Sequence, residues 1–173
     1  MPTPPETTAA ERLRRLREIE RRLLWLACWT VHNANHLRGA DAVKVGGHQA
    51  SSASMVSIMT ALYFHALRPE DRVAVKPHAS PVFHAAQYLT GGLDRAKLEA
   101  FRGWGGAQSY PSRTKDADDV DFSTGSVGLG VAVTAFAALV QDYLAAKPWS
   151  AVGEPGGRPL GRMVALVGDA ELD

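Results

Sequence analysis

Three short segments of the sequence contain residues that can move protons or bind a metal. In GGHQASSAS, His48 follows two glycines, and an imidazole gains or loses a proton near neutral pH. Paired glycines followed by small hydroxyl residues such as Ser51 are typical of a loop that opens a helix and favours an anion there. In VKPHASP, His78 follows an apolar segment and a proline that fixes the backbone direction. In VALVGDAELD, the sequence Gly168-Asp169 ends an apolar strand, and a carboxylate at that place suits Mg²⁺ between phosphates.

A fourth segment, DFSTGSVGLGVA, places glycines ahead of a long apolar stretch. Gly125, Gly128 and Gly130 leave room around Ser126 and Val127, so that backbone N–H groups there could face a phosphate. The spacing is not that of a dinucleotide-binding GxGxxG loop. We therefore interpret the segment as a helix start packed tightly against a cofactor or another chain.

Taken singly, each segment has a second interpretation. His48 could be an incidental exposed residue in a helix-capping segment, with Ser51 and Ser52 as caps. His78 could lie in a surface turn, and the strand-Gly-Asp pattern also arises by chance. A further pair, His32 and His36, lies one helical turn apart, but no third ligand is near it in the sequence and we expect no zinc site there.

The elements that must position these residues follow from the spacing of apolar residues. We expect helices over residues 8–37, 55–66, 81–92, 94–101 and 125–146, strands over 71–75 and 162–169, and a loop over 103–124. The 125–146 helix is apolar nearly all round, which predicts burial in a large core. Helices alternating with short apolar strands indicate an α/β fold with a parallel sheet flanked by helices. Residues 1–9 are expected to form a disordered arm, and residues 10–173 a partial domain.

Composition excludes several classes of protein. The chain has 173 residues, 46% hydrophobic and 21% charged, with a net charge of +1. This is the composition of an ordered domain without general attraction to nucleic acid or anionic lipid. No apolar run is long enough to span a bilayer, and the first residues lack the pattern of a secretory signal. A single cysteine, Cys28, fits a reducing compartment, so we expect a cytoplasmic protein.

The helix over residues 8–37 carries a basic face. Its arginines are interleaved with glutamates, which favours a solvated face of ion pairs over a binding face. The residues concerned are Arg12, Arg14, Arg15, Arg17, Arg21 and Arg22, with Glu11, Glu18 and Glu20. The alternative is a non-enzymatic interaction protein, a truncated homologue of an enzyme that docks through this helix.

Five motifs in order resemble one family. GGHQASSAS, VKPHASPVFHAAQYLTG, SYPS, STGSVGLGVA and VALVGDAELD, across residues 46–173, resemble the N-terminal, diphosphate-binding domain of thiamine-diphosphate-dependent enzymes. The GGHxASxAS and HxSP elements are most similar to the homodimeric pyruvate dehydrogenase E1, and transketolase shares the order. The resemblance implies a thiamine-diphosphate-binding fold, with thiamine diphosphate and Mg²⁺ as cofactors.

The resemblance also implies roles for individual residues. Asp169 would bind the Mg²⁺ that holds the diphosphate. His48 and His78 would line the channel beside the reactive thiazolium carbon, stabilise a developing oxyanion and move protons, with Ser51 near the substrate or cofactor. The remaining cofactor-binding residues would be Gly125, Ser126, Val127, Gly128, Gly168, Ala170 and Glu171.

Two departures from the family pattern bear on the site. Ala170 stands where the family usually has the last glycine of Gly-Asp-Gly, and Lys76 stands where E1 enzymes often have glutamine. A cation at residue 76 leaves the choice between a 2-oxo acid and a sugar phosphate open. The asparagine that completes the metal motif and the pyrimidine-binding domain would follow Asp173, so we expect no catalysis from these residues alone.

The expected function is therefore part of a pyruvate dehydrogenase E1-like enzyme, which decarboxylates pyruvate and transfers an acetyl group to lipoamide. Transketolase chemistry, the movement of a two-carbon unit between sugar phosphates, is the alternative. Expected partners are the small-molecule substrate, a second copy or the remaining C-terminal portion, and a lipoyl-bearing protein. Neither nucleic acid nor a membrane is expected.

Overall fold

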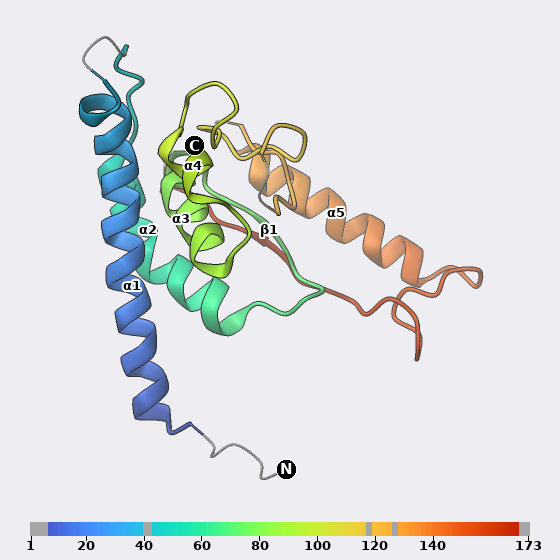
Figure 1. Cartoon of the computed structure of the whole chain (residues 1–173). Helices are drawn as coiled ribbons and strands as arrows, with labels where there is room; N and C mark the ends of the chain where they lie inside the picture. The colour runs from blue at the N-terminus through green and yellow to red at the C-terminus, as the bar shows by residue number, and fades with distance from the viewer. Residues whose placement is uncertain (1–6, 40–42, 117–118, 126–127, 170–173) are drawn as a thin grey trace.

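The computed structural model describes residues 7–39, 43–116, 119–125 and 128–169, and Figure 1 shows their arrangement. The elements in chain order are α1 (Ala9–His32), a π-helical turn (Asn33–Leu37), α2 (Gln49–Ala61), a second π-helical turn (Leu62–Ala66), β1 (Arg72–Ala74), a 3₁₀ turn (Pro77–Ala79), α3 (Ser80–Thr90), α4 (Arg95–Glu99), α5 (Leu129–Ala145) and β2 (Met163–Ala165). The predicted α/β class is confirmed. Within the described ranges, none of the helices has both the length and the apolar character that crossing a membrane requires.

The long first helix is confirmed. The Thr8 hydroxyl accepts a hydrogen bond from the N–H of Glu11 at 3.2 Å, which caps α1, and Leu23 and Ala27 are fully buried against α2 and α3. Leu13, one of the apolar residues at helical spacing in this helix, is 51% exposed, because burial along α1 begins only at Leu23. Most of the arm expected over residues 1–9 lies outside the described residues.

The second helix begins earlier than its apolar pattern predicts. α2 starts at Gln49, so Ser51 and Ser52 lie inside its first turn, and their assignment as caps is wrong. The cap position belongs to His48, whose side chain makes no capping hydrogen bond. Small residues carry no apolar signal, which is why the sequence pattern begins only at Met55.

The two strands form a parallel pair. Val73 lies opposite Val164, and the ladder continues past β2, where the N–H of Leu166 donates to the carbonyl of Ala74 at 2.9 Å. Val73 is buried in a core with Met59 and residues of α2 and α3, whereas Val164 is only half-buried. The strand expected over residues 162–169 is therefore shorter than predicted, and it is only half-buried.

A buried ion pair joins the beginnings of the two strands. The Asp71 carboxylate accepts hydrogen bonds from the backbone N–H groups of Arg68 (2.9 Å) and Arg162 (2.8 Å), and from the Arg162 guanidinium. These hydrogen bonds hold the pKa of the Asp71 carboxyl well below its usual range, although burial opposes them. Asp71 thus fixes the register of β2 against β1.

The last helix differs most from its prediction. α5 covers one side of the sheet, and α2 and α3 lie on the other (Figure 1). Only Thr134 of α5 is buried, while Phe136 is 67% exposed and Leu139 is 63% exposed. The prediction of a helix buried all round is wrong for the described chain, because α5 packs on β1 and β2 along one face only.

Candidate functional site

The glycine pair before His48 is held against α1. Gly47 has φ +138°, and a Cβ there would lie 2.8 Å from the Val31 side chain, so only glycine fits. The Asn35 side chain accepts from the N–H of Gly46 (2.8 Å) and donates to its carbonyl (2.9 Å). Asn35 was not singled out from the sequence, because its role depends on a contact eleven residues along the chain.

The two histidines predicted from separate motifs meet in the structure. His78 follows β1 and lies in the 3₁₀ turn Pro77–Ala79, and its ring centre is 4.5 Å from that of His48 at the start of α2. The interplanar angle is 43°. This contact joins residues thirty positions apart, although His48 is itself the exposed residue at the N-terminal cap of α2 and His78 lies in a turn, so their roles in a site stay a prediction.

The pair of rings favours the neutral state of His48. Burial lowers the pKa of this imidazole, and the nearby His78 and Arg102 lower it further. A neutral imidazole at pH 7 can accept a proton, and a positive charge on one ring disfavours a second charge on the other. The neutral imidazole of His48 is therefore available to accept a proton or a hydrogen bond.

Two further residues border this pair. The ring of Tyr110, from the SYPS motif, lies 6.4 Å from that of His78. Arg102 has φ +59°, donates to the Val45 carbonyl at 2.6 Å, and reaches toward Gly46. The sequence named the SYPS motif without giving Tyr110 a role, and Arg102 carried no pattern that would have selected it.

Hydroxyl groups without partners lie next to His48. The Oγ atoms of Ser51 and Ser52 are buried and make no hydrogen bond within the described chain, and Ser52 is fully buried. A buried hydroxyl without a partner is costly, so an acceptor or donor supplied by a ligand or by water would satisfy it. This observation fits a polar ligand near the start of α2.

The glycine turn before α5 is partly described. Gly128 has φ +72° and caps α5 without a side-chain hydrogen bond, and Gly130 lies so close to β1 that a Cβ would be 3.4 Å from Ala74. Gly125 is half-buried beside Thr124, whose hydroxyl donates to the Val75 carbonyl. The start of α5 is thus placed at the end of β1, while Ser126 and Val127 lie outside the described residues.

The predicted metal ligand follows β2. Gly168 is buried and Asp169 is exposed, so the carboxylate is accessible at the carboxyl end of the strand that pairs with β1. Because parallel strands end at the same edge, Asp169 and His78 both follow that edge of the sheet. Ala170 and Glu171 lie outside the described residues.

The donor set can be compared with the needs of Mg²⁺. Among the described residues, no group of three or more acidic, histidine or cysteine side chains is placed to hold a metal ion, and this applies also to His32 and His36. Mg²⁺ is commonly held by one or two carboxylates together with phosphate oxygens and water. The single carboxylate of Asp169 fits that arrangement only when a diphosphate supplies the remaining ligands.

The sequence is similar to those of proteins named as pyruvate dehydrogenase E1 components. The chain is 29% identical over 171 residues to the "Pyruvate dehydrogenase E1 component" of Mycolicibacterium smegmatis, covering 90% of this chain and 17% of the relative. This chain is a homologue of pyruvate dehydrogenase E1 components. The corresponding protein of Mycobacterium tuberculosis is 32% identical over 142 residues, covering 73% of this chain and 15% of that protein.

A transketolase also matches. The "Transketolase" of Staphylococcus aureus is 31% identical over 70 residues, covering 40% of this chain and 11% of the relative. The chain thus spans less than a fifth of the length of each of these three relatives. No protein-family model matches the chain.

Proposed function

We propose that this chain forms the first part of the diphosphate-binding domain of a thiamine-diphosphate-dependent enzyme, and that the enzyme acts on pyruvate in the manner of an E1 component. The observation that carries the proposal is the contact between the His48 and His78 rings at the carboxyl end of β1. Relatives that share nearly the whole chain and are named for pyruvate dehydrogenation support the same choice.

Some of these residues would bind the cofactor, and others would transfer protons. Bound thiamine diphosphate would supply a nucleophilic thiazolium carbon for chemistry at the carbonyl group of a 2-oxo acid. Asp169 would bind the Mg²⁺ on the diphosphate, with Gly168 and the backbone of residues 125–128 close to the phosphates. Glu171 and Ala170 are proposed to adjoin the same metal, and Ser51 to face the cofactor or the substrate.

The histidine pair would act on the substrate oxygen. When negative charge develops on that oxygen, an N–H of either imidazole can donate to it and stabilise the charge. His48, whose pKa is lowered, would be neutral at pH 7 and could accept a proton from the substrate, while a ring N–H of His78 would donate a hydrogen bond to the substrate oxygen. Tyr110, next to His78, would hold that ring in place through its own contact.

Cofactor binding gives the first test. Titration calorimetry of the full chain with thiamine diphosphate and Mg²⁺ should show binding that EDTA abolishes, and Asp169→Ala should weaken it by about tenfold or more. Asp94→Ala, which removes an exposed carboxylate that caps α4 elsewhere in the chain, is the matched control and should leave affinity unchanged. Equal affinity in all three proteins would refute the assigned metal ligand.

Substrate turnover gives the second test. The chain is assayed with the polypeptide that carries the remaining domains, against pyruvate and against xylulose 5-phosphate with ribose 5-phosphate. Pyruvate decarboxylation that falls at least about a hundredfold in His78→Ala is expected. Turnover of sugar phosphates alone would instead establish the transketolase alternative, which the Staphylococcus relative favours.

A further inference from the structure

An exposed stripe on α1 combines cationic and aromatic side chains. Arg14, Arg17, Arg21 and Trp25 are three or four residues apart, so they lie on one face of the helix and span about 16 Å along its axis. Trp29 continues the stripe, with its ring stacked 6.0 Å from that of Trp25. We call these five residues the arginine–tryptophan surface.

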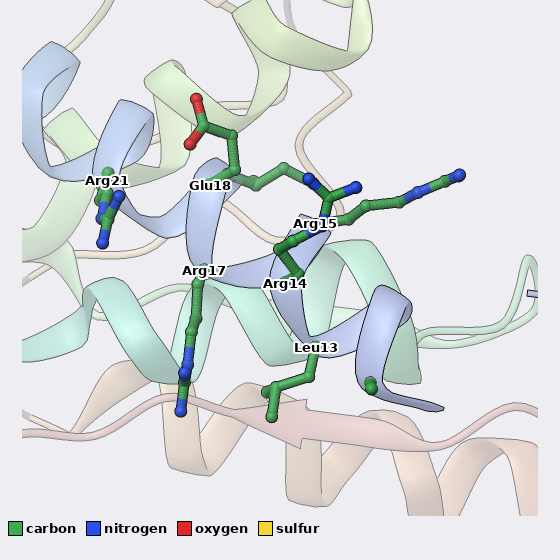
Figure 2. A pocket seen from close by; sticks show the side chains of 8 residues that line it. Leu13, Arg14, Arg15, Arg17, Glu18 and Arg21 are labelled. Carbon is green, nitrogen blue, oxygen red and sulfur yellow. The ribbon is translucent and has the colours of Figure 1, made fainter. Parts of the chain in front are cut away.

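The three arginines of this surface have no ion-pair partner among the described residues. The neighbouring arginines differ, because Arg15 pairs with Glu11 and Arg22 pairs with Glu18. Figure 2 shows Arg17 and Leu13 extending to one side of α1, with Glu18, the partner of Arg22, extending to the other. Three arginines without an ion pair among the described residues thus share one face, while Arg12, which also lacks one, lies on another face of α1.

Apolar side chains border the same surface. Leu13 is 51% exposed and Leu24 is 41% exposed, both on the edge opposite the two ion pairs. At the far end Trp25 is 62% exposed and, with Leu26 and Tyr88, lines two adjoining hollows of about 350 and 210 Å³ between α1 and the α3–α4 region. Large apolar side chains exposed beside arginines are typical of protein-binding surfaces, where Trp, Tyr and Arg provide most of the affinity.

We propose that the arginine–tryptophan surface binds an acidic, amphipathic helical segment of a partner protein. Guanidinium groups bind carboxylates in bidentate fashion, and carboxylates spaced three and four residues apart on a partner helix would match the arginine spacing. An apolar or aromatic side chain on the next turn of that helix would enter the hollows beside Trp25. This inference does not depend on the proposed catalytic function.

A protein segment fits this surface better than a nucleic acid. Phosphate-binding surfaces are broadly positive, whereas this stripe is flanked by the glutamates of the two ion pairs and belongs to a chain of net charge +1. The exposed leucines have no function toward a phosphate backbone, but they complement the apolar edge of an amphipathic helix.

The test uses a fluorescent synthetic peptide of about 18 residues, with glutamates at this spacing and leucine and phenylalanine on the following turn. Its binding to the full chain is measured by anisotropy at about 150 mM NaCl. We expect Arg17→Glu with Arg21→Glu to lower the affinity at least about tenfold, and Trp25→Ala about fivefold. Arg12→Glu, on another face of the same helix, is the matched control for the single variant Arg17→Glu, which carries the same charge change, and it should change affinity less than about twofold.

Three outcomes would overturn the proposal. The first is equal binding of a peptide with the same composition in scrambled order, since the spacing would then be irrelevant. The second is tighter binding of a single-stranded RNA than of the peptide at the same salt, which would assign the surface to nucleic acid. The third is the absence of peptide binding by a wild-type chain whose helix content by circular dichroism is intact. None of these binding measurements uses the cofactor or a substrate. A negative result would therefore overturn this proposal without testing the proposed function.

Discussion

The two sides of the sheet differ in how fully they bury their apolar residues. On the side of α1, α2 and α3, Phe83 and Met59 are no more than 1% exposed and belong to one continuous core. On the side of α5, Phe136 and Leu139 are more than 60% exposed although the helix is more apolar than α1. Apolar composition therefore predicts burial only where neighbouring elements surround the helix, and α5 has the strands on one face alone.

A matched pair of phenylalanines gives the largest test of this contrast. Phe83→Ala should lower the free energy of unfolding by about 4 kcal/mol, because it leaves a cavity in a close-packed core. Phe136→Ala should change it by less than about 0.5 kcal/mol, since that ring is mostly in water. Urea denaturation followed by circular dichroism measures both, and similar losses would show that α5 is buried in solution.

Breaking the ion pair between the strands should give the next largest loss in the free energy of unfolding. Asp71→Asn should cost roughly 2–3 kcal/mol, because the Arg162 guanidinium loses its buried partner although it is itself half exposed. Glu70→Gln, which removes a neighbouring charge that acts on Arg162 without forming its buried hydrogen bonds, should have a much smaller effect.

The same pair predicts a pH dependence. Since the folded chain lowers the pKa of Asp71, its stabilisation is fully present above the usual carboxyl pKa of about 4 and is lost as the pH falls below it. The stability difference between wild type and Asp71→Asn should therefore shrink as the pH is lowered from about 5 to 2. A difference that stays constant over that range would contradict the lowered pKa.

The glycine that places His48 should show a smaller effect. Gly47→Ala brings a Cβ against Val31 at a strained φ and should cost about 2 kcal/mol, with a change in the environment of His48 visible by NMR. Gly91→Ala, at φ +84° with open space around it, should cost about 1 kcal/mol and leave the His48 signals in place. If both substitutions lowered the free energy of unfolding equally and left the His48 signals unchanged, the contact with Val31 would not be what places His48.

The exposed face of α5 should show the smallest change in stability. Leu139→Lys should alter the unfolding free energy by less than about 0.5 kcal/mol while lowering self-association measured by sedimentation. The control is Leu98→Lys, which places a charge at a side chain only 2% exposed and should prevent folding. Unchanged sedimentation would show that this apolar face does not drive association.

The sequence by itself determined the elements and the residue types of the site. Helical spacing located α1, α3 and α4, and the apolar runs located both strands. These features are local, because a helix or strand is encoded by neighbours within a few residues. The ordered motifs likewise identified His48 and His78 without any structure.

Only the tertiary structure decided which of these residues meet and which apolar faces are covered. The 4.5 Å contact between the His48 and His78 rings, the Asn35 anchor of the glycine loop and the Asp71–Arg162 pair all join distant segments. Burial of α5 was predicted wrongly for the same reason, since exposure depends on which elements pack around a helix and not on its own composition. Local spacing sets the elements, and their packing sets the site.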